Sequence, residues 1–418
     1  MRILMTQKEK LKEAVVRAAV EGKLTAEEAG KRLGVSGRQV RKLKAKLREG
    51  QCLKHGNSRS SPKRMKDEPR TRIVNIYKDA RFEGSNFSHF KELLEIHFGI
   101  KVGYTVLAEI LNEAGIKSPK KQRKRKIHKS REPREYFGEL LQTDGSHHRW
   151  FEHAGDNNFY TLHGFIDDAT GTVTGCYFSK NECLDGYFEA FRQTLEKYGV
   201  PEAIYADGSS IFFGKQTNLS VFEIIDGVDE NKTQFGQIAE DLGINLIHAH
   251  SPQAKGKIER LWQTLQSRLI TEFKVHGITD MASANQFLPP FINKINKQFS
   301  RPAKFEKSLF LPLPRGINLD ILLTKTTTRQ LDAGLVFSLS NYKFRVDGGS
   351  PKATVKVLMS SRIGMKVLYQ DKLLVVTPLF PQERLLDIMH HYLLKNEHLA
   401  YGKIDIRRNF SLAKRTRY

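Results

Sequence analysis

The order of strand and helix patterns in the middle of this 418-residue chain constrains its fold more than any other feature. Three runs of alternating apolar residues, separated by turn residues, predict three neighbouring antiparallel strands. Two further strand patterns then alternate with three helical patterns. The strands are expected at 139–143, 159–166, 173–178, 203–206 and 244–247, and the helices at 184–197, 235–242 and 253–273. This order predicts an α/β layered domain with a mixed sheet.

The charge balance points to a polyanionic partner. Lys and Arg number 69 against 46 Asp and Glu, and the formal net charge of +23 exceeds what solubility requires. The hydrophobic content of 39% is close to globular usage, so we expect several folded domains. The chain has neither an apolar run of about 18 residues nor a secretory pattern, which predicts no membrane association and a cytoplasmic location. Its three cysteines lack the spacing of a disulfide framework or a zinc site.

Residues 1–50 predict a helix-turn-helix DNA-binding domain. Thr25 stands three residues before Glu28, and Ser36 three before Gln39, as in the capping boxes that begin helices. The helix expected at 37–48 has one apolar face and is otherwise basic, as in a recognition helix. The candidate DNA contacts on it are Arg38, Gln39, Arg41 and Lys42. A purely structural three-helix bundle is the alternative.

Two linkers and a second helical module are expected before the central domain. Residues 51–70 lose periodicity and predict a linker, whereas 71–117 predict a second helical module, possibly another helix-turn-helix. Residues 118–135 form a basic linker in which prolines prevent a continuous helix. Its candidate phosphate contacts are Arg123, Lys124, Arg125 and Lys126. A solvated linker without DNA contacts is the plainer interpretation.

Three carboxylates of the central segment stand where they can meet. Asp144 lies at the predicted end of the first strand and Asp207 follows a later strand, each before a glycine. Glu259 lies about 100° around its helix from the apolar stripe, so it can point toward the sheet edge. Carboxylates brought together repel one another unless a cation joins them, and Mg²⁺ or Mn²⁺ prefers such oxygen ligands. Two such ions about 3.5 to 4 Å apart could activate a hydroxyl and stabilise the leaving oxygen of a phosphodiester.

These residues carry a resemblance to a known family. Asp144 in Thr-Asp-Gly, Asp207 in Ala-Asp-Gly-Ser and Glu259 in Ser-Pro-Gln-Ala-Lys-Gly-Lys-Ile-Glu-Arg resemble the DDE triad of the retroviral integrase superfamily. The whole plan is similar to insertion-sequence transposases of the ISNCY type and, more distantly, to phage Mu transposase. The resemblance implies an RNase H-like catalytic core at 136–300 that holds two Mg²⁺ or Mn²⁺ ions. It also implies binding of double-stranded DNA, both terminal repeats and target, and assembly as a homo-multimer in the bacterial cytoplasm or nucleoid.

Two features depart from the family pattern. The interval between Asp207 and Glu259 is longer than in compact integrases, which predicts a surface insertion. Gln266 stands where many relatives carry a cation. The residues expected to contact DNA in its place are Lys255, Lys257, Arg260 or Arg268. Asp167 and Asp168 are interpreted as turn or cap residues and His248 and His250 as structural or solvent-facing, so none of these four joins the catalytic set.

The carboxyl end predicts a β-rich domain. Residues 301–330 are expected to be a linker and 331–380 a small SH3-like β-barrel, with turns at Asn341, 347–349 and 370–371. Residues 381–418 predict a basic tail. The sequence as a whole favours a DDE transposase that cleaves and joins DNA. The alternatives are a non-catalytic DNA-binding regulator derived from such an enzyme and an RNase H-like nuclease without strand transfer.

Overall fold

The computed structural model of the chain describes residues 7–50, 65–119, 132–214, 232–249, 255–339, 341–381 and 383–394. The chain divides into two compact units, Met1–Arg72 and Ile73–Tyr418. Across the described ranges, no helix is long and apolar enough to cross a membrane.

The first unit holds the three predicted amino-terminal helices, α1 (Gln7–Val20), α2 (Ala26–Leu33) and α3 (Gly37–Arg48). The capping box at Thr25 is confirmed, and the Ser36 hydroxyl accepts a hydrogen bond from the Gln39 N–H. The turn between α2 and α3 is tight, because a Cβ on Gly30 would meet the Val35 carbonyl oxygen at 2.6 Å. Gly34 ends α2 with a φ of +65°, which favours glycine. A three-residue connection of this kind is typical of helix-turn-helix motifs.

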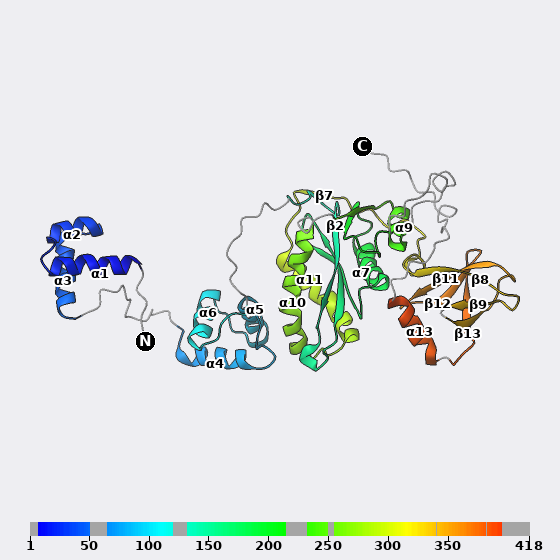
Figure 1. Ribbon diagram of the computed structural model, residues 1–418, viewed down its shortest axis with the longest axis horizontal. Helices are drawn as coiled ribbons and strands as arrows, with labels where there is room; N and C mark the ends of the chain where they lie inside the picture. The colour runs from blue at the N-terminus through cyan, green and yellow to red at the C-terminus, as the bar shows by residue number, and fades with distance from the viewer. Residues whose placement is uncertain are drawn as a thin grey trace. The chain divides into compact units, whose positions relative to one another are not determined.

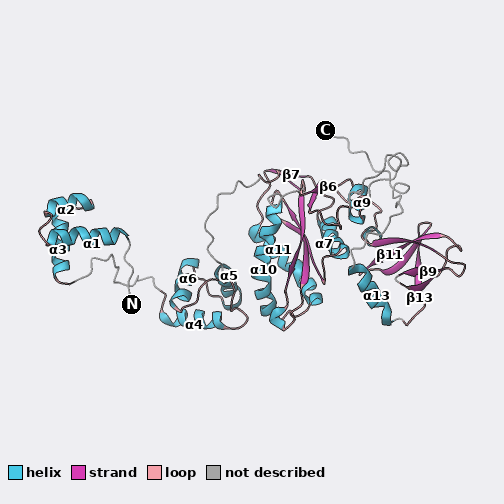
Figure 2. Cartoon of the chain, viewed as in Figure 1, coloured by secondary structure: helices cyan, strands magenta, loops and turns pink. Residues whose placement is uncertain are grey.

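The central domain is built on a five-stranded mixed sheet with the order β4-β3-β2-β5-β6. Its strands are drawn in magenta between helices in Figure 2. Strands β2 (Leu141–His148), β3 (Tyr160–Asp167) and β4 (Val173–Ser179) form the predicted antiparallel meander. Strands β5 (Ala203–Ala206) and β6 (Asn245–His248) continue the sheet in parallel with β2. The predicted mixed sheet is confirmed, and its strand order is that expected of an RNase H-like core.

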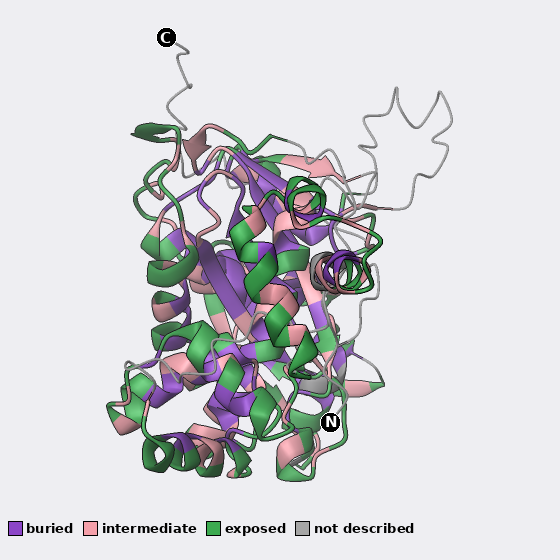
Figure 3. Cartoon of the chain, turned by 90° about the vertical axis from the view of Figure 1, so that its left-hand side faces the viewer, coloured by how far each residue is buried: buried purple, intermediate pink, exposed green. Residues whose placement is uncertain are grey.

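Helices cover both faces of this sheet (Figure 1). On one face α7 (Leu184–Lys197) and α9 (Gln234–Asp241) enclose an aromatic core that includes Phe165 and Phe235. On the other face α10 (Gly256–His276) and α11 (Met281–Phe299) pack with Trp150 and Phe178, beside the short helix η1 (Glu152–Ala154). The strands between these layers are buried (Figure 3).

The second helical module contacts the central domain directly. It comprises α4 (Asp67–Lys78), α5 (Phe87–Phe98) and α6 (Tyr104–Glu113), and the boundary between the two units falls inside α4. The Arg268 guanidinium on α10 donates two hydrogen bonds to the Glu92 carboxylate on α5, at 2.6 and 2.9 Å. His89 and Glu272 form a second, fully buried contact at 3.1 Å. These contacts fix α5 against the central domain.

The stretch expected to be a linker, 301–330, is structured, so that prediction is wrong. It contains β7 (Phe305–Ser308), which pairs with β1 (Tyr136–Phe137), and the short helix α12 (Leu319–Leu322). It ends in β8 (Lys325–Gln330), the first strand of the carboxyl-terminal sheet. The strand β8 was missed because its threonines read as polar, although their β-branched side chains favour strands.

The carboxyl-terminal domain is an antiparallel six-stranded sheet around one apolar core, with the order β8-β11-β12-β13-β10-β9. Its other strands are β9 (Val336–Leu339), β10 (Tyr342–Val346), β11 (Thr354–Ser360), β12 (Gly364–Tyr369) and β13 (Lys372–Pro378). The predicted turns are confirmed, since Asn341, Gln370 and Asp371 all have positive φ. The expected tail is partly wrong, because α13 (Glu383–Leu394) buries Ile388 and Tyr392 in this core. Residues 395–418 lie outside the described residues.

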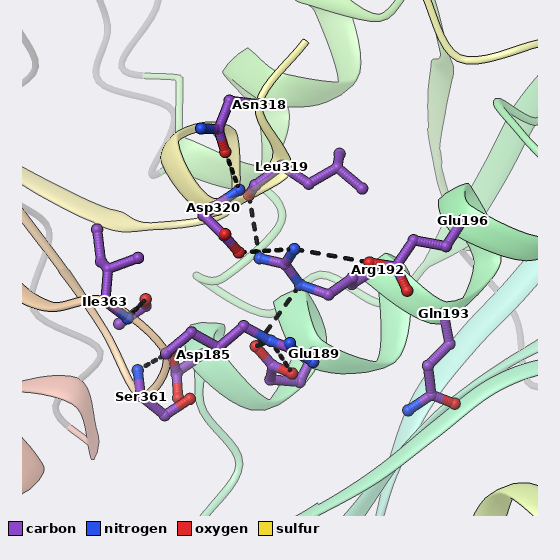
Figure 4. A network of polar contacts seen from close by, with 12 residues as sticks. Asp185, Glu189, Arg192, Gln193, Glu196, Asn318, Leu319, Asp320, Ser361 and Ile363 are labelled. Carbon is purple, nitrogen blue, oxygen red and sulfur yellow. Dashed lines mark hydrogen bonds and ion pairs between the residues drawn. The ribbon is translucent and has the colours of Figure 1, made fainter.

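An ion-pair network joins this domain to α7 (Figure 4). The Arg362 guanidinium donates to both carboxylate oxygens of Glu189, at 2.8 and 2.9 Å. Arg192, four percent exposed, lies between Glu189 at 3.8 Å and Asp320 at 2.9 Å. Buried charges need such partners, so the network ties the carboxyl-terminal domain and the segment before it to the central domain.

Candidate active site

The strand register brings Asp144 and Asp207 together. Strand β2 pairs in parallel with β5, Leu141 opposite Ile204 and Gln142 opposite Tyr205. Continuing this register places Asp207 beside Asp144. Asp207 directly follows β5, as predicted, whereas Asp144 lies inside β2 and not at its end, because pairing with β3 extends β2 to His148. The two side chains are 22% and 42% exposed, so they lie at an open edge of the sheet.

A lysine ammonium group lies between the two carboxylates. Lys255 Nζ donates to Asp144 Oδ1 at 2.7 Å and lies 3.7 Å from Asp207 Oδ2. The other oxygen of Asp144 accepts a hydrogen bond from Trp262 Nε1 at 3.0 Å. The Trp262 ring fits there because β3 has a glycine opposite Asp144: a Cβ on Gly164 would meet the ring at 2.6 Å. Both oxygens of Asp144 are therefore held in place by α10.

The start of α10 is anchored to the sheet by Gln142, two residues before Asp144. Its side-chain oxygen accepts from the backbone N–H groups of Lys257 and Ile258, each at 3.2 Å. These are first-turn donors that have no partner within a helix. Gln142 Nε2 in turn donates to Asp168 Oδ1 at 2.6 Å. The sheet thus sets the position of the helical turn that carries Glu259.

Glu259 itself is not brought into the pair. It is exposed on the first turn of α10, and the described residues contain no group of three acidic, histidine or cysteine side chains close enough to hold a metal ion. The structure therefore unites two of the three predicted catalytic residues. The Ser-Pro-Gln-Ala stretch just before Lys255, and with it His250, lies outside the described residues.

Glycine after each aspartate allows another side chain to approach. A Cβ on Gly208 would meet His248 Nε2 at 2.6 Å, which places His248 against the residue that follows Asp207. A Cβ on Gly145 would meet the carboxyl carbon of Glu182 at 3.2 Å. Sequence reasoning missed Glu182, which precedes α7 in a polar turn where a glutamate carries no distinguishing signal.

The predicted DNA contacts of α10 differ in their surroundings. Lys255 is buried against Asp144, and Lys257 Nζ donates to the backbone oxygens of Asp168 and Ala169. Arg260 is exposed. Arg268 is bound to Glu92, and Gln266 Nε2 donates to Ser146 Oγ at 3.0 Å.

The other predicted residues are located as follows. On α3, the side chains of Arg38, Gln39, Arg41 and Lys42 are all exposed. Those of the basic linker, Arg123, Lys124, Arg125 and Lys126, lie outside the described residues. The turn interpretation of Asp167 is confirmed, because its carboxylate accepts from the Thr170 N–H three residues later. The Asp168 carboxylate instead accepts from the distant Arg134 N–H and from Gln142 Nε2.

Comparison with known proteins identifies the family to which this α/β protein belongs. No protein-family model matches the chain. The chain is 34% identical over 355 residues to a transposase for insertion sequence IS1202 from Streptococcus pneumoniae, a match that covers 77% of this chain and 74% of the relative. It is 33% identical over 349 residues to the putative transposase y4bF of Sinorhizobium fredii (strain NBRC 101917 / NGR234), covering 82% and 74%. The chain belongs to the insertion-sequence transposases and is a DNA transposase.

Solved structures give weaker matches. A chain of the simian T-cell lymphotropic virus intasome, in complex with PP2A regulatory subunit B56 gamma, aligns with 74% of this chain and all of its own length. Its identity is 16% and its TM-score 0.32. The HTLV-2 integrase catalytic core domain in complex with magnesium aligns with 38% of this chain and 82% of its own, at 18% identity and a TM-score of 0.27.

Proposed function

We propose that this transposase cleaves DNA at the terminal repeats of its insertion sequence and joins the cut ends to target DNA, with Asp144, Asp207 and Glu259 as metal-binding catalytic residues. The observation that carries the proposal is the cation already shared by two of them. Lys255 Nζ contacts Asp144 and approaches Asp207, so the pair forms a binding site for positive charge made of hard oxygen donors. Such donors suit Mg²⁺ or Mn²⁺.

Each residue of the site has a distinct task. Asp144 is oriented by Trp262 and Asp207 by a hydrogen bond from the Ser209 N–H at 3.2 Å. Glu259 lies exposed on the first turn of α10, which is anchored to the sheet. It would complete the set of metal-binding residues by moving toward the two aspartates. When bound, two divalent ions would supply the positive charge that stabilises attack on a phosphodiester. The ammonium of Lys255 must then leave the carboxylates, which frees it to contact a DNA phosphate.

We assign DNA binding to surfaces outside the sheet edge at which Asp144 and Asp207 lie. The exposed polar and basic side chains of α3, Arg38, Gln39, Arg41 and Lys42, suit contact with base edges and phosphates in a major groove. Arg260 on α10 and the four cations of the basic linker are proposed to contact phosphates. We further propose that the enzyme acts as a homo-multimer on paired element ends in the bacterial cytoplasm or nucleoid, and that its carboxyl-terminal sheet is an SH3-like barrel.

Single substitutions of the three carboxylates test the chemistry. Asp144→Asn, Asp207→Asn and Glu259→Gln keep the side-chain shape and remove the charge. Each should lower strand cleavage and strand transfer by roughly three orders of magnitude, several kcal/mol of transition-state stabilisation, and leave DNA binding intact. Near wild-type joining by any variant would exclude that residue. Wild-type protein that cuts without joining would instead be a nuclease, and one that binds without cutting would be a regulator.

A further inference from the structure

A fourth acidic side chain, that of Glu182, lies against Gly145, the residue that follows Asp144. Glu182 belongs to the loop between β4 and α7, and its Oε1 accepts a hydrogen bond from Tyr187 Oη at 2.7 Å. Tyr187 is fully buried. A donor that cannot move away fixes the carboxylate in one position.

The backbone after Asp144 shows how close this carboxylate comes. A Cβ on Gly145 would lie 3.2 Å from the carboxyl carbon of Glu182 and 3.3 Å from Tyr187 Oη. Burial raises the pKa of Glu182, the hydrogen bond from Tyr187 lowers it, and the charges of Asp207 and Asp144 raise it again. The ammonium group of Lys255 lowers the pKa of Glu182. Glu182 therefore belongs to the same electrostatic field as the catalytic pair.

The loop that carries Glu182 is held in place by a buried histidine, His163. His163 Nε2 accepts a hydrogen bond from the Cys183 N–H at 3.3 Å, and Nδ1 lies 3.2 Å from the Tyr177 carbonyl oxygen, to which it donates. Burial lowers the pKa of His163 to about 4, so the ring is neutral and able to accept. The ring packs against Gly186, where a Cβ would meet it at 2.4 Å. Such support is typical of residues that orient a functional site.

We propose that Glu182 is a positioning residue of the active site, an outer acidic group that strengthens cation binding by Asp144 and Asp207 without itself coordinating the ion. The inference rests on the proposed function of that pair. Direct coordination is not assigned, because Glu182 lies against Gly145 and not against either aspartate carboxylate. Outer groups of this kind tune metal affinity through their charge.

The test is Glu182→Gln, which can still accept from Tyr187 but carries no charge. Binding of Mg²⁺ and Mn²⁺ is measured without DNA by calorimetry and by the metal-induced rise in melting temperature, and the metal dependence of strand transfer is measured in parallel. We expect the half-saturating metal concentration to rise roughly tenfold, with a near-normal rate at saturating metal. Glu152→Gln, on an exposed side chain, is the matched control and should change neither.

A further variant separates charge from fold. Glu182→Asp keeps the charge and should recover most of the metal affinity that Glu182→Gln loses. An unchanged metal affinity in Glu182→Gln, or equal losses in the Gln and Asp variants, would overturn the inference. If Asp144→Asn also bound metal normally, the proposed catalytic site would fail as well, so the two failures are distinguishable.

Discussion

Replacing Lys255 by methionine should make the protein bind divalent cations more tightly while it becomes less stable without them. The ammonium of Lys255 neutralises Asp144 and Asp207, so a metal ion must displace it before the carboxylates are free. Methionine has a similar length but no charge. In the variant the carboxylates repel each other until a cation arrives, and no internal competitor opposes that cation.

The burial of the contact between Lys255 and Asp144 determines how much the metal affinity should rise. The side chains of Lys255 and Asp144 are 11% and 22% exposed, so the contact is only partly screened by water. Removing one partner of a fully buried pair costs about 3 to 5 kcal/mol, and exposed pairs contribute less than about 1 kcal/mol, which places this contact at about 2 kcal/mol. Because about 1.4 kcal/mol corresponds to a factor of ten, metal affinity should rise about 30-fold.

Calorimetric titration with Mg²⁺ and Mn²⁺ in the absence of DNA measures this gain, and thermal unfolding without metal measures the loss of stability. Lys257→Met is the matched control. It removes an ammonium group from the same turn of α10, but that group donates to the backbone oxygens of Asp168 and Ala169. Unchanged affinity in Lys255→Met, or an equal gain in Lys257→Met, would refute the idea that Lys255 competes with the metal.

Three other predictions concern DNA binding and domain contacts. Replacing Arg38, Gln39 and Lys42 by alanine should reduce discrimination between terminal-repeat and random DNA in gel shifts; equal loss on both DNAs would make α3 a phosphate binder. Neutralising the four candidate cations of the basic linker should lower the slope of log K against log salt by about 0.9 per lost phosphate contact, and an unchanged slope would remove them from the interface. Burial raises the pKa of Glu272, but His89 and Lys294 outweigh it and lower the pKa to about 2. Its stabilisation is therefore complete above an unfolded pKa near 4.5 and is lost as pH falls toward 2. Glu272→Gln should flatten this part of the acid dependence of urea unfolding, and an unaltered profile would contradict the assignment.

The local pattern of the sequence was enough to predict the order of the sheet elements, the capped helices and the place of Asp207 directly after β5. Alternation with period two and helical spacing report which side chains face a core. The same rules failed at β8 and α13. The threonines of β8 look polar, and the apolar face of α13 has meaning only against the sheet it covers. A sequence pattern predicts that a side chain is buried, but it does not identify the strand or helix that buries it.

The neighbours of the aspartate pair, Asp144 and Asp207, were decided by tertiary structure alone. The parallel register of β2 and β5 sets Asp144 beside Asp207, and the anchored start of α10 brings Lys255 between them. The same geometry places Glu182 at Gly145 and leaves Glu259 exposed. The amino-acid sequence by itself determined which side chains are able to bind a cation. Which of them share one electrostatic field depends on distances across strands and loops, because charge interactions act through space and not along the chain.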